Sequence, residues 1–222
     1  MRFRQTMLRG ASRMFLYSAL TFAVAAPMLT TAQPPVLTFQ ASLYTRLDTI
    51  PGTPTVNGAG PFTTFTSDLR RNGKQELIVG MGTIPPTVKT NVPVRVLRPE
   101  GGRLYDVTRD LFGNGAIPLR SHPREVITAD FNGDGRPDIF IAAHGWDTSP
   151  WEGERNVLMI SRPDGSFEDR SAALPESSDF SHSTTVADIN GDGFLDIYVG
   201  QVGGQARVPP YFLMGRGDGT FA

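Results

Sequence analysis

The sequence predicts an all-β protein, a β-propeller of four-stranded blades with about three blades present in an incomplete ring. Two observations predict this fold class. An acidic, glycine-containing loop recurs with its first aspartates at Asp68, Asp130 and Asp188, a period of about sixty residues. Short apolar or β-branched segments flank each loop, which is typical of strand, turn, strand. A stacked solenoid is the alternative, and the repeat length and strand count favour blades over it.

The composition fits a folded, loop-rich protein. The 222 residues include 24 Gly and 18 Pro, while 39% are hydrophobic and 9% aromatic, which is enough for a core. Lys and Arg (21) nearly balance Asp and Glu (22), so the charge predicts no nucleic-acid partner. Cysteine is absent, which excludes disulfides, a thiolate metal site and a cysteine nucleophile.

Residues 1–32 are predicted to be a secretory signal peptide. Four arginines and no acid occupy residues 1–13, and an apolar run follows over residues 14–29. The run is short for a membrane span, and small residues at 30–32 offer a cleavage site, so no span is expected after cleavage. Retention as an anchor is the alternative. We therefore expect the chain to be secreted, periplasmic or on the cell surface.

Residues 33–60 are interpreted as an N-terminal lead-in strand region, and residues 61–222 as three repeat units. The units cover about 61–120, 121–178 and 179–222. In the second unit, strands are predicted at 126–129, 139–143, 156–160 and 166–170. The second strand of each unit is continuously apolar, which is typical of a strand covered on both faces.

Three units do not close a ring, because propellers usually have four to eight blades. The chain also ends inside the segment that corresponds to a fourth strand in the other units. We interpret the sequence as the N-terminal part of a longer protein, with the remaining blades beyond residue 222.

Two of the acidic loops are predicted to bind Ca²⁺. Oxygen-bearing side chains stand at loop positions 1, 3, 5 and 9, and hard oxygen donors in a glycine-kinked loop suit this cation. The candidate side-chain ligands are Asp130, Asn132, Asp134 and Asp138 in one loop and Asp188, Asn190, Asp192 and Asp196 in the other. Arg136 and Phe194 would each contribute a backbone carbonyl. A metal-free Asp/Asn/Gly turn is the alternative.

An EF-hand is excluded, because it needs a helix on each side of the loop and a glutamate at position 12, where Ile141 and Val199 stand. The third loop, from Asp68 to Glu76, is a degenerate copy. It carries Arg70 where the second ligand stands in the other loops, so we expect it to bind no calcium. Arg70 could instead neutralise Asp68 or Glu76.

The two full loops, each followed by Ile-aromatic-Ile/Val, and the Asp-Gly-Ser/Thr-Phe turns resemble the FG-GAP (VCBS) repeats of integrin-α-type β-propellers. The resemblance covers about residues 61–222 and is strongest at 130–143 and 188–200. It implies a propeller that usually has seven blades, with calcium in loops on one face and ligands on the opposite face. The ten loop residues named above would then hold the two calcium ions. The family includes adhesion modules, lectin-like binders and substrate-guiding parts of secreted enzymes, so the fold alone does not decide the function.

Six residues outside the acidic loops are candidate ligand contacts. His144, Trp146, Asp147 and Trp151 lie in or next to one loop after a predicted strand, and loops on a rigid scaffold often bind ligands. Arg124 and His182 each lie six residues before a loop aspartate. The alternatives are tryptophans packed between blades and polar residues that are merely capped or solvated.

The favoured function is a secreted calcium-binding module for extracellular binding or adhesion, with a glycan or protein ligand and a structural calcium. The alternative is part of a calcium-dependent secreted enzyme that degrades polysaccharides. No hydrolase motif such as Gly-x-Ser-x-Gly or His-Glu-x-x-His is present, so no catalytic residue is assigned. A purely structural surface repeat is a third possibility.

Overall fold

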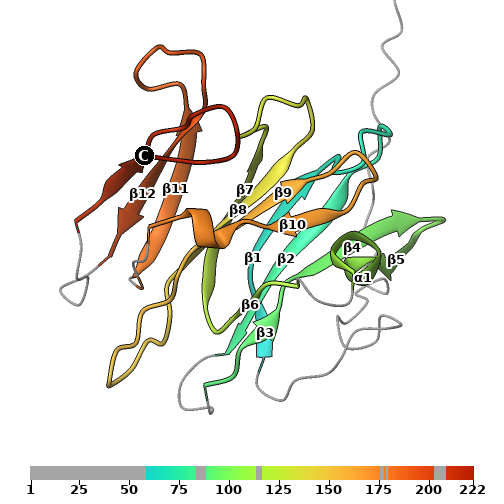
Figure 1. The fold of residues 1–222 in the computed structure, drawn as a ribbon. Coiled ribbons are helices and arrows are strands. Elements are labelled where there is room, and N and C mark those ends of the chain that lie inside the picture. The colour runs from blue at the N-terminus through green and yellow to red at the C-terminus, as the bar shows by residue number, and fades with distance from the viewer. Residues whose placement is uncertain (1–58, 84–88, 114–116, 176–177, 179, 203–208) are drawn as a thin grey trace, which may run out of the picture. The chain divides into compact units, whose positions relative to one another are not determined.

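Three antiparallel sheets follow one another along the chain in the computed structural model (Figure 1). The structure describes residues 59–83, 89–113, 117–175, 178, 180–202 and 209–222. The predicted signal peptide, and the lead-in region up to residue 58, lie outside the described residues. All described residues belong to one unit, Leu43–Ala222.

Each sheet is a meander whose strands are neighbours in chain order. The first contains β1 (Ala59–Ser67), β2 (Glu76–Thr83), β4 (Arg95–Glu100) and β5 (Arg103–Asp106). The second contains β7 (Pro123–Ala129), β8 (Asp138–Ala143), β9 (Val157–Ser161) and β10 (Phe167–Asp169). The third contains β11 (Ser181–Ala187), β12 (Asp196–Gln201) and β13 (Tyr211–Leu213). The prediction of a mostly β protein is confirmed at the level of several small antiparallel sheets.

Short helical turns close the first two sheets, and the sequence did not predict them. They are α1 (Thr108–Phe112) and a 3₁₀ turn at Ser171–Ala173. Each begins in the same way, because Asp106 accepts the Thr108 N–H (3.0 Å) and Asp169 accepts the Ser171 N–H (2.9 Å). A further pair of two-residue strands, β3 (Val92–Pro93) and β6 (Leu119–Arg120), was not predicted either.

The core lies between neighbouring sheets, and β8 is covered on both faces. All six of its residues are buried. Ile139 and Ile141 belong to an apolar cluster that they share with β2 and β4 of the first sheet. Phe140 and Ala142 face the other way, into a cluster shared with β12 and β13. The prediction drawn from the continuously apolar run of this strand is therefore confirmed.

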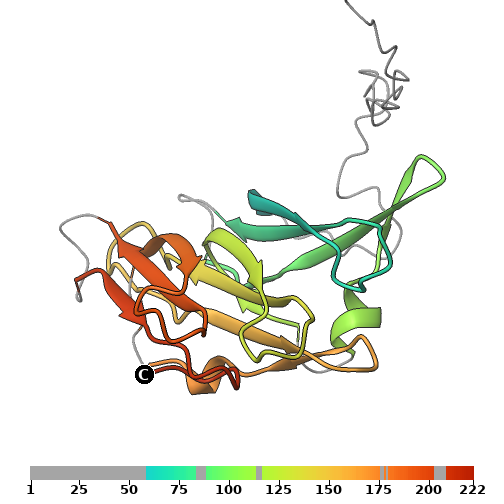
Figure 2. The same cartoon turned by 90° about the horizontal axis from the view of Figure 1, so that it is seen from above.

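The first strands of the three sheets are neighbours in space. β1 packs against β7, and β7 packs against β11 (Figures 1 and 2). Hydrogen bonds cross both boundaries: the Thr83 N–H donates to the Ser121 carbonyl (2.8 Å), and the Thr184 N–H donates to Glu125 Oε2 (2.6 Å). As a result, the three acidic loops, which follow the C-terminal ends of these strands, lie at one end of the strands, and the N-terminal ends of the strands lie at the opposite end.

Candidate functional site

The acidic loop between β7 and β8, residues 130–138, is held closed by its own side chains. The two carboxylate oxygens of Asp130 accept the backbone N–H groups of Asp134 (3.0 Å) and Gly135 (2.7 Å). Asn132 Oδ1 accepts the same Asp134 N–H (3.1 Å), and its amide nitrogen donates to Asp134 Oδ2 (2.9 Å). The side-chain oxygens of loop positions 1, 3 and 5 therefore turn toward the inside of one small loop.

The same loop recurs in the other two sheets. Asp188 accepts the N–H groups of positions 5 and 6 at 3.1 and 2.9 Å, and Asp68 accepts those of its loop at 2.9 and 2.7 Å. Positions 4 and 6 have a positive φ in all three loops, which favours glycine. These positions are Gly133, Gly135, Gly191, Gly193, Arg71 and Gly73. The degenerate first loop thus keeps this backbone even at Arg71, a non-glycine residue with a φ of 53°.

The acid at loop position 9 is fully buried and joins its loop to the third strand of the sheet. Asp138 accepts the Phe131 N–H of the loop (2.9 Å) and the Ser161 N–H of β9 (2.8 Å). Asp196 does the same in the third sheet, with the Ile189 N–H (2.9 Å) and the Gly215 N–H (2.7 Å). Burial raises the pKa of Asp138 to about 6, although the hydrogen bonds from Ser161 and Phe131 lower it. In this structure both acids act as clamps within the fold.

The first sheet forms this clamp with different residues. Pro99 occupies the position equivalent to Ser161 and has no N–H to donate. Glu76 accepts the Leu69 N–H (3.1 Å) and pairs with the Arg98 guanidinium (3.3 Å). Of the two acids that the sequence offered as partners of Arg70, Asp68 and Glu76, Glu76 pairs with Arg98 instead.

The first three ligand positions of the two full loops fit a calcium ion in their donor chemistry. Positions 1, 3 and 5 offer two carboxylates and an amide oxygen, which are hard donors. Within the described ranges, no three His, Asp or Glu side chains gather closely enough to form a ready-made metal cage. The acids at position 9 do not complete such a cage, because both of their carboxylate oxygens already accept backbone N–H groups. A bound ion would also need carbonyl oxygens or water.

The two full loops differ in their internal charge. In the second sheet, Arg136 Nη2 pairs with Asp134 Oδ2 at 2.6 Å. Burial raises the pKa of Asp134, but hydrogen bonds from Asn132 and Arg136 and the Arg136 charge lower it overall. In the third sheet, Phe194 stands at the equivalent position, and the carboxylate of Asp192 bonds only to Asn190 and the loop backbone. A calcium ion must therefore compete with the Arg136 guanidinium in the loop 130–138, and with no such group in the loop 188–196.

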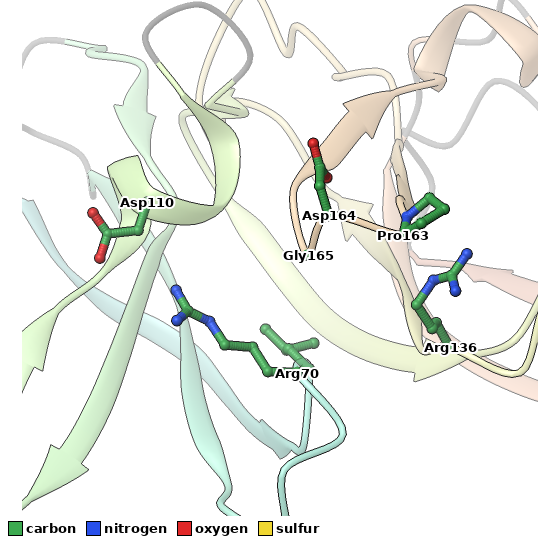
Figure 3. Close-up of a pocket in the computed structure, with 7 residues that line it drawn as sticks. Arg70, Asp110, Arg136, Pro163, Asp164 and Gly165 are labelled. Atoms are coloured by element: carbon green, nitrogen blue, oxygen red, sulfur yellow. The ribbon is translucent and has the colours of Figure 1, made fainter.

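A cleft of about 440 Å³ lies beside two of the acidic loops (Figure 3). Arg70 enters it from the first loop and Arg136 from the second. Asp110 of α1 and Asp164 of the turn between β9 and β10 also line it. Its two arginines and two aspartates balance in charge, so it shows no preference for a charged ligand.

At the opposite ends of the strands, each first strand carries a β-bulge at the same repeat position. The strand pairing shifts between Pro61 and Thr63, between Pro123 and Glu125, and between Ser181 and Ser183. The residues left out of the pairing are Phe62, Arg124 and His182. A bulge redirects a side chain and is common next to binding sites.

The bulges help to bring the three histidines of the chain together, with Arg124 and Phe62 beside them. We call these five residues the histidine cluster. The His144 ring lies 5.2 Å from that of His122 and 5.2 Å from that of His182, both edge to face. The Phe62 ring lies 4.1 Å from His122, and the Arg124 guanidinium lies 5.9 Å from the Phe62 ring. These side chains come from all three sheets.

The cluster contains buried polar atoms without hydrogen-bond partners. His122 is 2% exposed and His144 4% exposed. Both ring nitrogens of His122, Nδ1 of His144 and Nε of Arg124 make no hydrogen bond. Such groups are rare in folded proteins, because an unpaired buried polar atom costs about 1–3 kcal/mol.

Burial and the charge of Arg124 keep all three imidazoles unprotonated. Burial first, and then Arg124, lower the pKa of His122 to about 4. The same two causes lower the pKa of His144 and His182, against the opposing charge of Asp147. The Gly145 backbone acts in the opposite direction and raises the pKa of His122. At neutral pH the cluster therefore presents one guanidinium and three neutral rings.

The loop after β8 covers one side of the cluster. Its Asp147 is exposed and pairs with Arg124 at 3.7 Å, a long ion pair. Trp146 is buried. Its backbone N–H donates to the Glu152 carbonyl (2.7 Å), which closes the loop. Trp151 is half-buried in the same loop. Of the six candidate ligand contacts, the structure brings Arg124, His144, Asp147 and His182 together, and Trp146 and Trp151 lie in the adjoining loop.

His122 and Phe62 were missed by the sequence reasoning. Phe62 lies six residues before Asp68, the same offset that drew attention to Arg124 and His182, so the repeat register could have identified it. His122 has no such signal. It reaches the cluster because Glu154 holds the chain before β7, accepting the Ser121 N–H (2.9 Å) and the His122 N–H (3.3 Å).

Comparison with known protein families identifies the repeat. Residues 130–199 match the FG-GAP-like repeat. This FG-GAP-like repeat contains both full acidic loops and the segment between them, as the sequence predicted. No curated protein matches the chain. Among the described residues, no helix is long and apolar enough to cross a membrane.

Proposed function

We propose that the chain is part of a secreted, calcium-stabilised β-propeller that binds an extracellular glycan or protein ligand at the histidine cluster. One observation carries this proposal. All three sheets repeat the same acidic loop at one end and the same β-bulge at the other. Each repeat therefore has one end suited to holding a cation and another that presents a variable side chain.

Two observations support a propeller arrangement. The first strands of consecutive sheets are neighbours, as the innermost strands of blades are. The outer face of the third sheet carries apolar side chains that no described element covers, since Phe212 is 50% exposed and packs beside Tyr198. We propose that a further repeat unit covers this face, as the second sheet covers the first.

Calcium would be held by positions 1, 3 and 5 of the two full FG-GAP-like loops. FG-GAP repeats commonly bind calcium. In the third sheet the side-chain donors are Asp188, Asn190 and Asp192. When bound, the ion would neutralise carboxylates that otherwise repel one another and would tie the loop residues together. Because Arg136 already pairs with Asp134, we expect the loop 188–196 to bind calcium more tightly than the loop 130–138.

Thermal unfolding of the full chain in EDTA and in a calcium series tests the structural role of calcium. With a dissociation constant of about 10⁻⁴ M, about 1 mM calcium would add about 1.4 kcal/mol for each site. That corresponds to a rise in Tm of roughly 3–6 °C for a domain of this size. Asp192→Asn should remove more of this rise than Asp134→Asn.

The control for this experiment is Asp110→Asn, which removes an exposed aspartate of α1 outside the acidic loops. Its calcium response should equal that of the unmodified chain. A cooperative transition that calcium does not shift would show that the loops are metal-free turns.

The histidine cluster also favours a second candidate function, an enzyme that degrades acidic polysaccharides. A neutral imidazole can act as a general base, and Arg124 could hold a carboxylate beside it. Incubation with a panel of polysaccharides separates the two functions. New reducing or unsaturated ends would support the enzyme, whereas binding to a glycan array without product would support the binding module.

A further inference from the structure

We propose that the histidine cluster binds the carboxylate of a uronic acid unit in an acidic polysaccharide. This rests on the proposed function, because it names the ligand class of the same site. Arg124 and His182 would contact the carboxylate, since both are partly exposed. His122 and His144 lie behind them as buried positioning residues.

The guanidinium of Arg124 favours an anion over a metal ion within the cluster, and the carboxylates nearby are Asp147, which pairs with Arg124, and Glu125, which lies beside His182. Three histidines in a small volume would suit a transition metal, but in the described part of the chain no such group converges on one point. Arg124 adds a positive charge that lowers the pKa of all three rings. A cation would be repelled by this charge, whereas an anion would be attracted to it and could accept hydrogen bonds from the partly exposed Arg124 and His182.

A carboxylate matches the donors in shape and charge. Its two oxygens can accept from a guanidinium and from an imidazole N–H, and charged hydrogen bonds of this kind are strong. The existing partner of Arg124 is weak by comparison, because Asp147 lies 3.7 Å away and is exposed. Arg124 Nε is buried and makes no hydrogen bond. An incoming carboxylate could replace Asp147 and satisfy the guanidinium better.

Phe62 favours a sugar acid over an acidic peptide. Its ring is half-buried at the bulge position, 5.9 Å from the Arg124 guanidinium. A pyranose ring has an apolar face that packs on an aromatic ring while its carboxylate reaches a neighbouring cation. An aspartate or glutamate side chain has no such face, so it would use Arg124 and leave Phe62 uncovered.

Binding should be coupled to proton uptake. The charged groups that face the cluster are Arg124 and Asp147, with Glu125 beside His182 and Glu154 bonded to the backbone of His122. In the free chain, burial and Arg124 keep the pKa of His182 low. A bound carboxylate would raise it, so affinity should increase as the pH falls from 7.5 to 5.5.

Titration of the full chain with oligogalacturonate by calorimetry tests the proposal. Arg124→Ala should weaken binding by roughly ten- to a hundredfold, the loss expected for a charged hydrogen bond. Arg124→Lys should recover only part of it, because lysine lacks the planar fork. Arg103→Ala, which removes an exposed arginine of β5, should bind like the unmodified chain. His182→Gln should remove most of the pH dependence.

A variant with the opposite effect guards against simple misfolding. Asp147→Asn removes the competing carboxylate and should tighten binding, whereas Asp110→Asn makes the same charge change in α1 and should not. Equal binding of polyglutamate, with the same dependence on Arg124, would overturn the sugar assignment. Binding of a neutral galactan that Arg124→Ala leaves unchanged would overturn the carboxylate site and leave the proposed binding function intact.

Discussion

The side chain of His122 lies in an environment that differs strongly from water. Its imidazole is 2% exposed, lies between Phe62 and His144, and has no hydrogen bond at either nitrogen. Burial and Arg124 bring its pKa to about 4, so protonation of this ring opposes folding.

This predicts an acid-sensitive fold. The folded pKa lies below the unfolded value of about 6.5, so the unfolded chain binds more protons between these two values. The free energy of unfolding should therefore fall as the pH drops from 6.5 to 4, with His122 contributing up to about 3 kcal/mol. Urea unfolding of the unmodified chain and of His122→Phe across this range measures the contribution. Identical slopes for the two proteins would contradict it.

The aspartates of one acidic loop have different tasks. In the third sheet, Asp192 is exposed and bonds only within its loop, whereas Asp196 is buried and holds the loop to the segment after β13. The sequence predicts both as calcium ligands, and the spacing that supports this prediction does not show where their oxygens point.

A pair of variants separates these tasks. Asp196→Asn places an amide N–H against a backbone N–H, so it should lower the free energy of unfolding by about 1–3 kcal/mol in EDTA and in calcium alike. Asp192→Asn should change stability only when calcium is present. Urea unfolding of both variants in each buffer distinguishes them. A loss in Asp196→Asn that appears only with calcium would show that this residue is a metal ligand.

At the scale of elements, the strands were predictable and their irregularities were not. Apolar runs such as residues 139–143 identified β8 because its two faces meet two cores. The helical turn α1 has only five residues, and Asp106 accepts the N–H of its first residue, Thr108, which is too little pattern to predict a helix. The bulges were not predictable either, because the unpaired residue is defined by the register between two strands and not by the local sequence of either strand.

The same limit applies to the candidate sites. The acidic loops are local in sequence, so their spacing revealed both the turn and its donors. The histidine cluster joins residues 62, 122, 124, 144 and 182, and only the packing of three sheets brings them together. Arg124 and His182 could be proposed from the repeat register, whereas His122 required the structure.

At the scale of the whole molecule, the three sheets do not have equivalent surroundings. The second is covered on both faces, but the third is covered on one face only within the part of the chain described. Its other face carries Phe212 and Tyr198, with ring centroids 5.3 Å apart. Phe212 is half exposed and Tyr198 partly exposed, and an uncovered apolar surface of this kind favours association.

We therefore expect the chain to self-associate through this face when no further repeat unit covers it. Phe212→Ser should reduce association while changing the free energy of unfolding by less than about 1 kcal/mol, because the side chain is half exposed. Tyr105→Ser, at another exposed aromatic residue, is the matched control and should not change association. Sedimentation velocity over a range of concentrations gives the result. Equal association of all three proteins would exclude this face.

The recurring bulge separates specificity from architecture. Its backbone is the same in all three sheets, yet the residue it carries is an apolar ring in one, a permanent cation in another and a titratable ring in the third. A single substitution at one of these three positions can therefore change ligand preference without changing the backbone of the bulge that presents the side chain. A library randomised at residues 62, 124 and 182 would sample new recognition chemistries on an unchanged scaffold.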